Sequence, residues 1–88
     1  MSFFISQFSP QADKSVKKLD AITKERVKEK IDKLEQNPFP QDVERVDDYK
    51  DEKVFRVRVG KYRILYIVRY NPNSIIITKV EKRSKVYE

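Results

Sequence analysis

The strongest constraint on the fold is the stretch around Gly60, the one glycine of the chain, where polar and apolar residues alternate on both sides. Such alternation predicts β-strands at Lys53–Val59 and Tyr62–Tyr70, which leaves Gly60 and Lys61 as the connection between them. Glycine at the first of two loop positions is typical of a type II′ hairpin turn. The sequence therefore predicts an antiparallel hairpin whose register is fixed by its turn.

This register assigns the side chains of the hairpin to two faces. On one face Arg58 lies directly opposite Arg63, and Arg56 lies on the diagonal, roughly 7 to 8 Å away. Like charges opposite one another destabilise a sheet by up to about 1 kcal/mol, and no acidic residue occurs at positions 53–69 to relieve them. The other face should pack against helices through Phe55, Val57, Val59, Tyr62, Ile64 and Tyr66.

The clustered arginines have two interpretations. Arginines on a solvent-facing strand can splay into water and contribute only to solubility. Alternatively they form a cradle for phosphate, because guanidinium groups bind phosphate oxygens bidentately and stay charged. The segregation of charge favours the cradle, since positions 53–69 carry a net charge of +6 whereas positions 42–52 carry −4.

The N-terminal half predicts a strand followed by two helices. An apolar run indicates the strand at Phe3–Phe8, and Ser9 and Pro10 then supply an N-cap and a first helical residue. We expect Thr23 to cap the second helix, which the run Asn37–Pro40 would end. The short connection between the helices predicts an antiparallel helical hairpin. The buried stripes would be Ala12, Val16 and Leu19 in the first helix and Val27, Ile31 and Leu34 in the second.

The remaining segments complete an α+β domain. Positions 42–52 hold six acidic and two basic residues, and we interpret them as a loop with a short edge strand at Val43–Val46. A further alternating stretch predicts a strand at Ser74–Glu81, after a turn at Asn71–Asn73. We expect one domain over residues 1–88, in which the N-terminal strand and the antiparallel helical hairpin pack on a mostly antiparallel four-stranded sheet.

Composition narrows the classes of function. The chain has 88 residues with 20 Lys and Arg against 14 Asp and Glu, and its net charge of +6 favours a polyanion or an acidic protein as the partner. Cysteine is absent, which excludes disulfides and thiolate metal sites. The acidic residues near position 50 match no calcium-loop spacing, so we expect neither a metal nor a cofactor. No apolar run approaches the ~18 residues of a membrane span, so we expect a soluble, cytoplasmic protein without a membrane partner.

The stretches VFRVRVGKYRILYIV and IIITKVEKRSKVYE, at residues 54–68 and 75–88, resemble the RelE branch of the RelE/ParE toxin superfamily. The resemblance covers nearly the whole chain. It implies a small antiparallel-sheet protein, similar to microbial ribonucleases, that enters the A site of the 30S ribosomal subunit and cuts mRNA there. The implied reaction needs no metal. The 2′-hydroxyl attacks the neighbouring scissile phosphate, and the products are a cyclic phosphate and a 5′-hydroxyl. The implied partner is an acidic RelB-type antitoxin, which wraps the toxin in a hetero-oligomeric complex and inhibits it.

The same resemblance implies which residues act on RNA. The basic positions of the hairpin correspond to Arg56, Arg58 and Arg63, the basic residue after the last strand to Arg83, and the terminal tyrosine to Tyr87. Preorganised cations stabilise the negative charge of the phosphorane transition state, and a tyrosine can stack on an unpaired base. We expect four lysines to contact RNA as well: Lys53, Lys61, Lys82 and Lys85.

The chain departs from those relatives that use lysine, or a glutamate and histidine pair, to move protons. It has no histidine, and arginine is a very poor base, so Lys53, Glu81, Lys82 and Tyr87 stay open as proton carriers. Two other functions also stay open. One is a ParE-like inhibitor of DNA gyrase, a class that generally lacks such paired arginines. The other is a protein of this fold that only binds RNA or an antitoxin.

Overall fold

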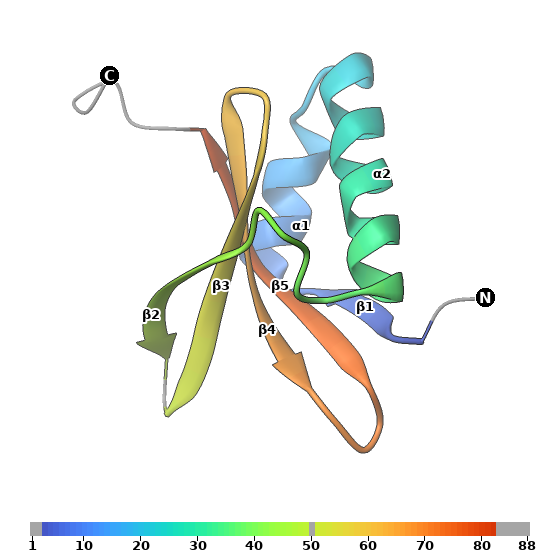
Figure 1. Cartoon of the computed structure of the whole chain (residues 1–88). Helices are drawn as coiled ribbons and strands as arrows, with labels where there is room; N and C mark the ends of the chain where they lie inside the picture. The colour runs from blue at the N-terminus through green and yellow to red at the C-terminus, as the bar shows by residue number, and fades with distance from the viewer. Residues whose placement is uncertain (1–2, 50, 83–88) are drawn as a thin grey trace.

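Two helices cover one face of a five-stranded sheet in the computed structural model, which describes residues 3–49 and 51–82 (Figure 1). The strands lie in the order β1-β5-β4-β3-β2 across the sheet. The predicted α+β fold class is confirmed. Along the chain the elements are β1 (Ile5–Phe8), α1 (Pro10–Lys17), α2 (Ala21–Gln36), β2 (Glu44–Tyr49), β3 (Glu52–Val59), β4 (Tyr62–Arg69) and β5 (Ser74–Lys82).

The N-terminal strand belongs to the sheet itself. β1 pairs in parallel with β5, where Ile5 lies opposite Ser74, whereas the other neighbouring strands are antiparallel. It therefore adds a fifth strand to the four-stranded sheet of the prediction. This pairing connects segments that lie far apart in the sequence.

The acidic segment also differs from its prediction. The edge strand is longer than Val43–Val46, because β2 runs over Glu44–Tyr49. A bulge between Arg45 and Asp47 shifts its register against β3. The extended pairing turns most of the predicted loop into the second outer strand of the sheet.

The β3–β4 hairpin has the predicted register. Arg58 pairs with Arg63, and the neighbouring residues pair in step with them. Gly60 has a φ of 56° whereas Lys61 does not have a positive φ, which is the combination of a type II′ turn. Residues with a Cβ rarely adopt such a φ, so the turn depends on glycine at this position.

Both helices begin at capping side chains. The hydroxyl of Ser9 accepts a hydrogen bond from the backbone N–H of Ala12 at 3.1 Å, so Ser9 is the N-cap of α1, as predicted. The predicted cap of α2 is wrong. Asp20 takes that place, because its carboxylate accepts a hydrogen bond of 3.2 Å from the backbone N–H of Thr23. The helix therefore begins at Ala21, earlier than predicted.

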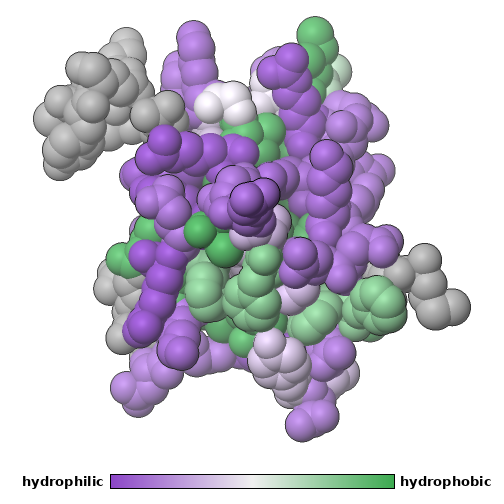
Figure 2. Space-filling model, viewed as in Figure 1, coloured by the Kyte–Doolittle hydropathy of each residue, from purple (hydrophilic) through white to green (hydrophobic). Residues whose placement is uncertain are grey.

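The core lies between the helices and the sheet face that the hairpin register assigned to them. Burial of its apolar surface is the main favourable contribution to folding. Hydrophilic side chains dominate the surface seen in Figure 2, with apolar side chains gathered in smaller patches. Neither of the helices in the described residues is long and apolar enough to cross a membrane. The buried cluster comprises Phe4, Ala12, Val27, Ile31, Leu34, Val57, Ile64, Tyr66, Ile75, Ile77 and Val80.

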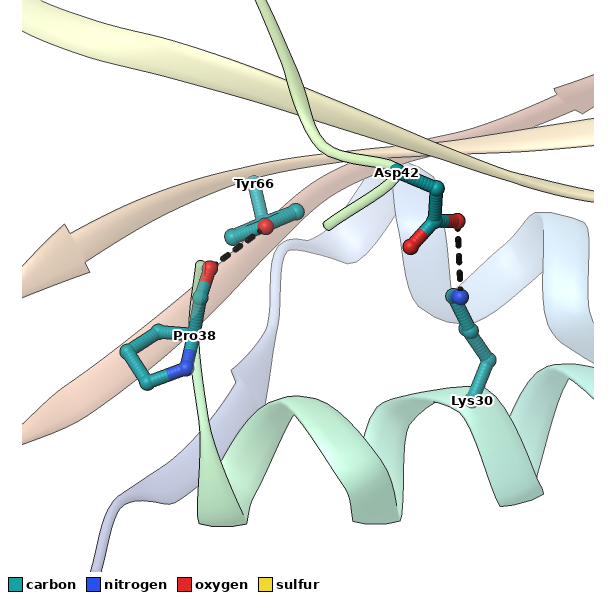
Figure 3. A network of polar contacts seen from close by, with 4 residues as sticks. All are labelled: Lys30, Pro38, Asp42 and Tyr66. Atoms are coloured by element: carbon teal, nitrogen blue, oxygen red, sulfur yellow. Dashed lines mark hydrogen bonds and ion pairs between the residues drawn. The ribbon is translucent and has the colours of Figure 1, made fainter. Parts of the chain in front are cut away.

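Two polar contacts tie the loop after α2 to the helix and to the sheet (Figure 3). The buried phenol of Tyr66 donates a hydrogen bond of 2.7 Å to the carbonyl oxygen of Pro38. The ammonium of Lys30 lies 2.9 Å from a carboxylate oxygen of Asp42. Burial raises the pKa of the Tyr66 phenol, and the negative charge of Asp42 raises it further. Because this loop leads into β2, the two contacts position the start of that strand.

We expect Tyr66→Phe to destabilise the fold by about 1 to 3 kcal/mol, because the Pro38 carbonyl loses its buried hydrogen-bond donor. Urea unfolding at neutral pH measures this free energy. Above about pH 10 the difference from wild type should shrink, since the unfolded phenol then ionises while the buried phenol stays neutral. The control is Tyr70→Phe, whose side chain is 58% exposed and should change stability by less than about 0.5 kcal/mol. Equal stabilities of Tyr66→Phe and wild type would contradict this role of the hydroxyl.

Candidate anion-binding face

Three arginines near the turn of the β3–β4 hairpin lie on the sheet face opposite the helices, and we name this group the arginine face; Arg69, at the far end of β4, lies on the same side. Arg56 and Arg58 come from β3, and Arg63 comes from β4 directly across from Arg58. Alternation explains the placement, because the adjacent residues Val57 and Ile64 point into the core on the helix side. The structure thus brings together three of the predicted site residues.

Carboxylates from the two flanking strands reach the arginine face. Glu44 of β2 lies opposite Arg56, and its carboxylate oxygen accepts a hydrogen bond of 2.6 Å from Nη2 of that arginine. Glu81 of β5 lies opposite Arg63, with 3.4 Å between its carboxylate oxygen and Nε. The expectation that no acid relieves these arginines is therefore wrong for two of the three. It considered the hairpin alone, whereas the acids lie on the strands beside it.

The compensation of charge on the arginine face is incomplete. Arg58 is exposed and has no hydrogen bond or ion pair to any residue that the structure describes. The buried Nε groups of Arg56 and Arg63 also lack a hydrogen-bond partner within the described ranges. The pKa of Glu44 is lowered by the hydrogen bond from Arg56, then by the charge of Arg56 and more weakly by that of Arg58. A phosphate, with more acceptor oxygens than one carboxylate, can replace these glutamates as the partner of the guanidinium groups.

The other predicted contact residues are placed in different parts of the molecule. Alternation puts Lys53 and Lys82 on the helix side of the sheet, so they do not share a face with the arginines. Lys61 lies at the exposed tip of the hairpin. Three further predicted site residues lie outside the described residues: Arg83, Lys85 and Tyr87.

The sequence interpretation misses a groove on the same side of the sheet as the arginine face. The groove has a volume of about 540 Å³ and is lined by apolar side chains together with the cations Arg69 and Lys79. Its signal in the sequence is the run Ile64–Val68, which is apolar or aromatic at every position and so places such side chains on both faces of β4. The apolar lining consists of Val54, Leu65, Ile67 and Ile76 with Pro10.

We expect Glu44→Gln to lower the stability of the protein at neutral pH but not in acid. The pKa of Glu44 lies below its ordinary value of 4.5, so its ion pair with Arg56 contributes to stability above that pH and is lost as the pH falls through the folded-state pKa. Urea midpoints of wild type and variant should therefore differ at neutral pH and converge in acid. Glu25→Gln is the control, because Glu25 is exposed on α2. A difference for Glu44→Gln that persists unchanged at about pH 3 would contradict this prediction.

Three comparisons place the chain among known proteins. The family model described as the ParE toxin of type II toxin-antitoxin system, parDE, matches residues 7–87. The RelE1 protein of Methanocaldococcus jannaschii is 35% identical over 78 residues, which is 85% of this chain and 84% of that protein. The archaeal RelE–RelB complex from Pyrococcus horikoshii OT3 gives a TM-score of 0.81 at 28% identity and covers 94% of this chain and 98% of that chain.

The isolated E. coli RelE toxin shares the fold, with a TM-score of 0.77 at 23% identity over 96% of this chain and 90% of that chain. The order of the elements, the basic hairpin and the match along residues 7–87 all agree with one assignment. The chain therefore belongs to the RelE/ParE superfamily, the toxins of type II toxin-antitoxin systems.

Proposed function

We propose that this toxin is an endoribonuclease that acts on the ribosome and cuts mRNA in the A site. The observation that carries the proposal is the arginine face, where Arg56, Arg58 and Arg63 gather three guanidinium groups on one side of the sheet. Such groups bind phosphate bidentately and keep their charge at any working pH. Similarity to RelE proteins supports the same reaction class. Arg83 and Tyr87 complete the proposed site, and Tyr87 stacks on an unpaired base.

In the proposed reaction the 2′-oxygen of one nucleotide forms a bond to phosphorus, and the bond from phosphorus to the next 5′-oxygen breaks. The products are a 2′,3′-cyclic phosphate and a 5′-hydroxyl. The 2′-hydroxyl gives its proton to a base, and the departing 5′-oxygen receives a proton from an acid. The phosphorane transition state carries more negative charge than the starting phosphodiester, so preorganised arginines stabilise the transition state more strongly.

We propose Glu81 as the base. Of the candidates in the described residues, Lys53 and Lys82 lie on the helix side of the sheet, whereas the carboxylate of Glu81 lies 3.4 Å from Nε of Arg63. A carboxylate can accept a proton, which a guanidinium cannot. Glu81 would thus combine two roles, since it neutralises Arg63 before RNA binds and accepts a proton afterwards. Tyr87 remains the other candidate for proton transfer.

We expect Arg63→Ala to lower the rate of A-site cleavage by about 10²- to 10³-fold, because the transition state loses a preorganised cation. Primer extension on mRNA from a purified translation reaction locates and counts the cuts. The control is Lys18→Ala, which removes the same charge at the exposed end of α1. Cleavage at the wild-type rate by a folded Arg63→Ala variant would exclude the arginine face as the site of reaction.

A second function is favoured by the description of the matching family model, which names the ParE toxin. We therefore keep inhibition of DNA gyrase as the alternative. Induced expression separates the two functions, because A-site cleavage creates new mRNA 5′ ends at defined codons. Loss of plasmid supercoiling without such ends would favour gyrase inhibition. If induced expression causes neither mRNA cleavage nor loss of supercoiling, the function that remains is binding of RNA or an antitoxin.

We infer that an acidic antitoxin covers this toxin in a hetero-oligomeric complex. The P. horikoshii structure is a complex of RelE with RelB, and the chain described here carries a net charge of +6. The groove beside the arginine face supplies apolar contact next to positive charge. A partner segment with acidic and apolar side chains suits both surfaces, and opposite charge accelerates its association.

We expect Ile76→Glu to weaken binding of an acidic RelB-type antitoxin by about 10-fold or more, since a charge in the groove opposes apolar contact. Isothermal titration at two salt concentrations measures the affinity, which should also fall as salt rises. Ile22→Glu is the matched control, because Ile22 is 70% exposed on α2. Equal effects of both substitutions would exclude the groove, and affinity indifferent to salt would contradict the electrostatic part of the proposal.

A further inference from the structure

A second cleft lies on the helix side of the sheet, where the tip of the β3–β4 hairpin meets the first turns of α2, and we name it the tip cleft. Figure 1 shows the hairpin tip and the start of α2 at the same end of the molecule. The cleft has a volume of about 350 Å³. Its lining offers a guanidinium, an ammonium, a hydroxyl and an aromatic ring but no carboxylate: Thr23, Arg26, Val59, Gly60, Lys61 and Tyr62.

Arg26 brings an uncompensated charge to the tip cleft. It forms no hydrogen bond or ion pair with any residue in the described part of the chain, although Glu29 follows it on the same helix. Its Nη1 lies 3.9 Å from the position that a Cβ would take at Gly60, so the guanidinium reaches toward the hairpin turn. Three other arginines, in contrast, each pair with a glutamate: Arg56, Arg63 and Arg69.

The size and chemistry of the tip cleft suit one nucleotide. Pockets for small ligands begin at about 300 Å³. Tyr62 is half-buried beside Val59, and an aromatic ring of this kind is the usual platform for an unpaired base. The guanidinium of Arg26 and the ammonium of Lys61 suit a phosphate. The hydroxyl of Thr23 hydrogen-bonds the Asp20 carboxylate and can still accept a hydrogen bond from a ribose hydroxyl.

Positively charged side chains extend from the tip cleft to the arginine face. Arg58, which has no ion pair to any described residue, lies two residues before Gly60 on the opposite side of the hairpin. Lys61 lies at the tip between the two surfaces. A single strand that crosses the tip would therefore meet positive charge on both sides, and each phosphate contact would release counterions from the RNA.

We propose that the tip cleft binds one unpaired nucleotide of RNA at a site separate from the arginine face. The inference rests on the proposed function only in taking RNA as the ligand. It assigns no residue of the cleft to bond breaking, so its contribution is to affinity. In this arrangement Tyr62 holds the base, while Arg26 and Lys61 hold the phosphate.

The test measures binding of a fluorescein-labelled oligouridylate of about ten nucleotides to the full chain, by anisotropy between about 50 and 200 mM salt. Arg26→Ala should weaken binding about 5- to 10-fold and reduce the slope of log Kd against log salt by about 0.7, the value of one phosphate contact. Tyr62→Leu should weaken binding about 5-fold without a change of slope, because it removes stacking and not charge. Lys24→Ala, an exposed charge on the same helix outside the cleft, is the control and should change affinity less than about 2-fold.

Similar affinities of Arg26→Ala and Lys24→Ala would overturn the inference, and so would a wild-type protein that does not bind the oligonucleotide. Thermal unfolding establishes that each variant is folded. The cleavage assay keeps the two proposals apart. If Arg26→Ala binds the oligonucleotide more weakly but the wild-type protein cleaves no mRNA, the cleft is supported and the proposed function is overturned. If the wild-type protein cleaves mRNA but Arg26→Ala leaves the affinity for the oligonucleotide unchanged, only the inference about the cleft is overturned.

Discussion

The positive φ of Gly60 is the constraint on which the rest of the molecule depends. A two-residue turn of this type permits one register, and register decides which side chains share a face. A slip of one residue in β4 would turn Arg63 toward the core and Tyr66 to the opposite face of the sheet. The same turn therefore places the buried phenol that anchors the loop after α2, the arginine face, and the lining of the tip cleft.

The fold is predictable where the signal is local. The hairpin register and the Ser9 cap depend on residues within a few positions of each other, and both predictions are confirmed. The contact of Glu44 with Arg56 spans 12 positions and depends on strand pairing beside a bulge, which no short pattern specifies. The candidate site likewise combines features set by local sequence with features set by strand pairing. Alternation predicts that the arginines share a face, but charge counted along the chain cannot identify acids that reach them from neighbouring strands.

Acids on the flanking strands change what RNA binding would require. Glu44 and Glu81 offset part of the repulsion among the guanidinium groups, so the arginines can be held close together before a ligand arrives. A phosphate then has to replace a carboxylate, so each contact contributes less binding free energy than a contact with an arginine that has only water as its partner. Binding through several contacts at once compensates for this smaller gain, which favours a polyanion over a single anion.

The outer strand β2 has a further consequence for the protein in the cell. An edge strand exposes backbone donors and acceptors to which another chain can add. Four of the six residues of β2 are charged, and the bulge between Arg45 and Asp47 interrupts the straight row of backbone groups. Both features hinder edge-to-edge addition and the growth of aggregates along this border. The strand that supplies a glutamate to the arginine face thus also protects the open sheet against polymerisation.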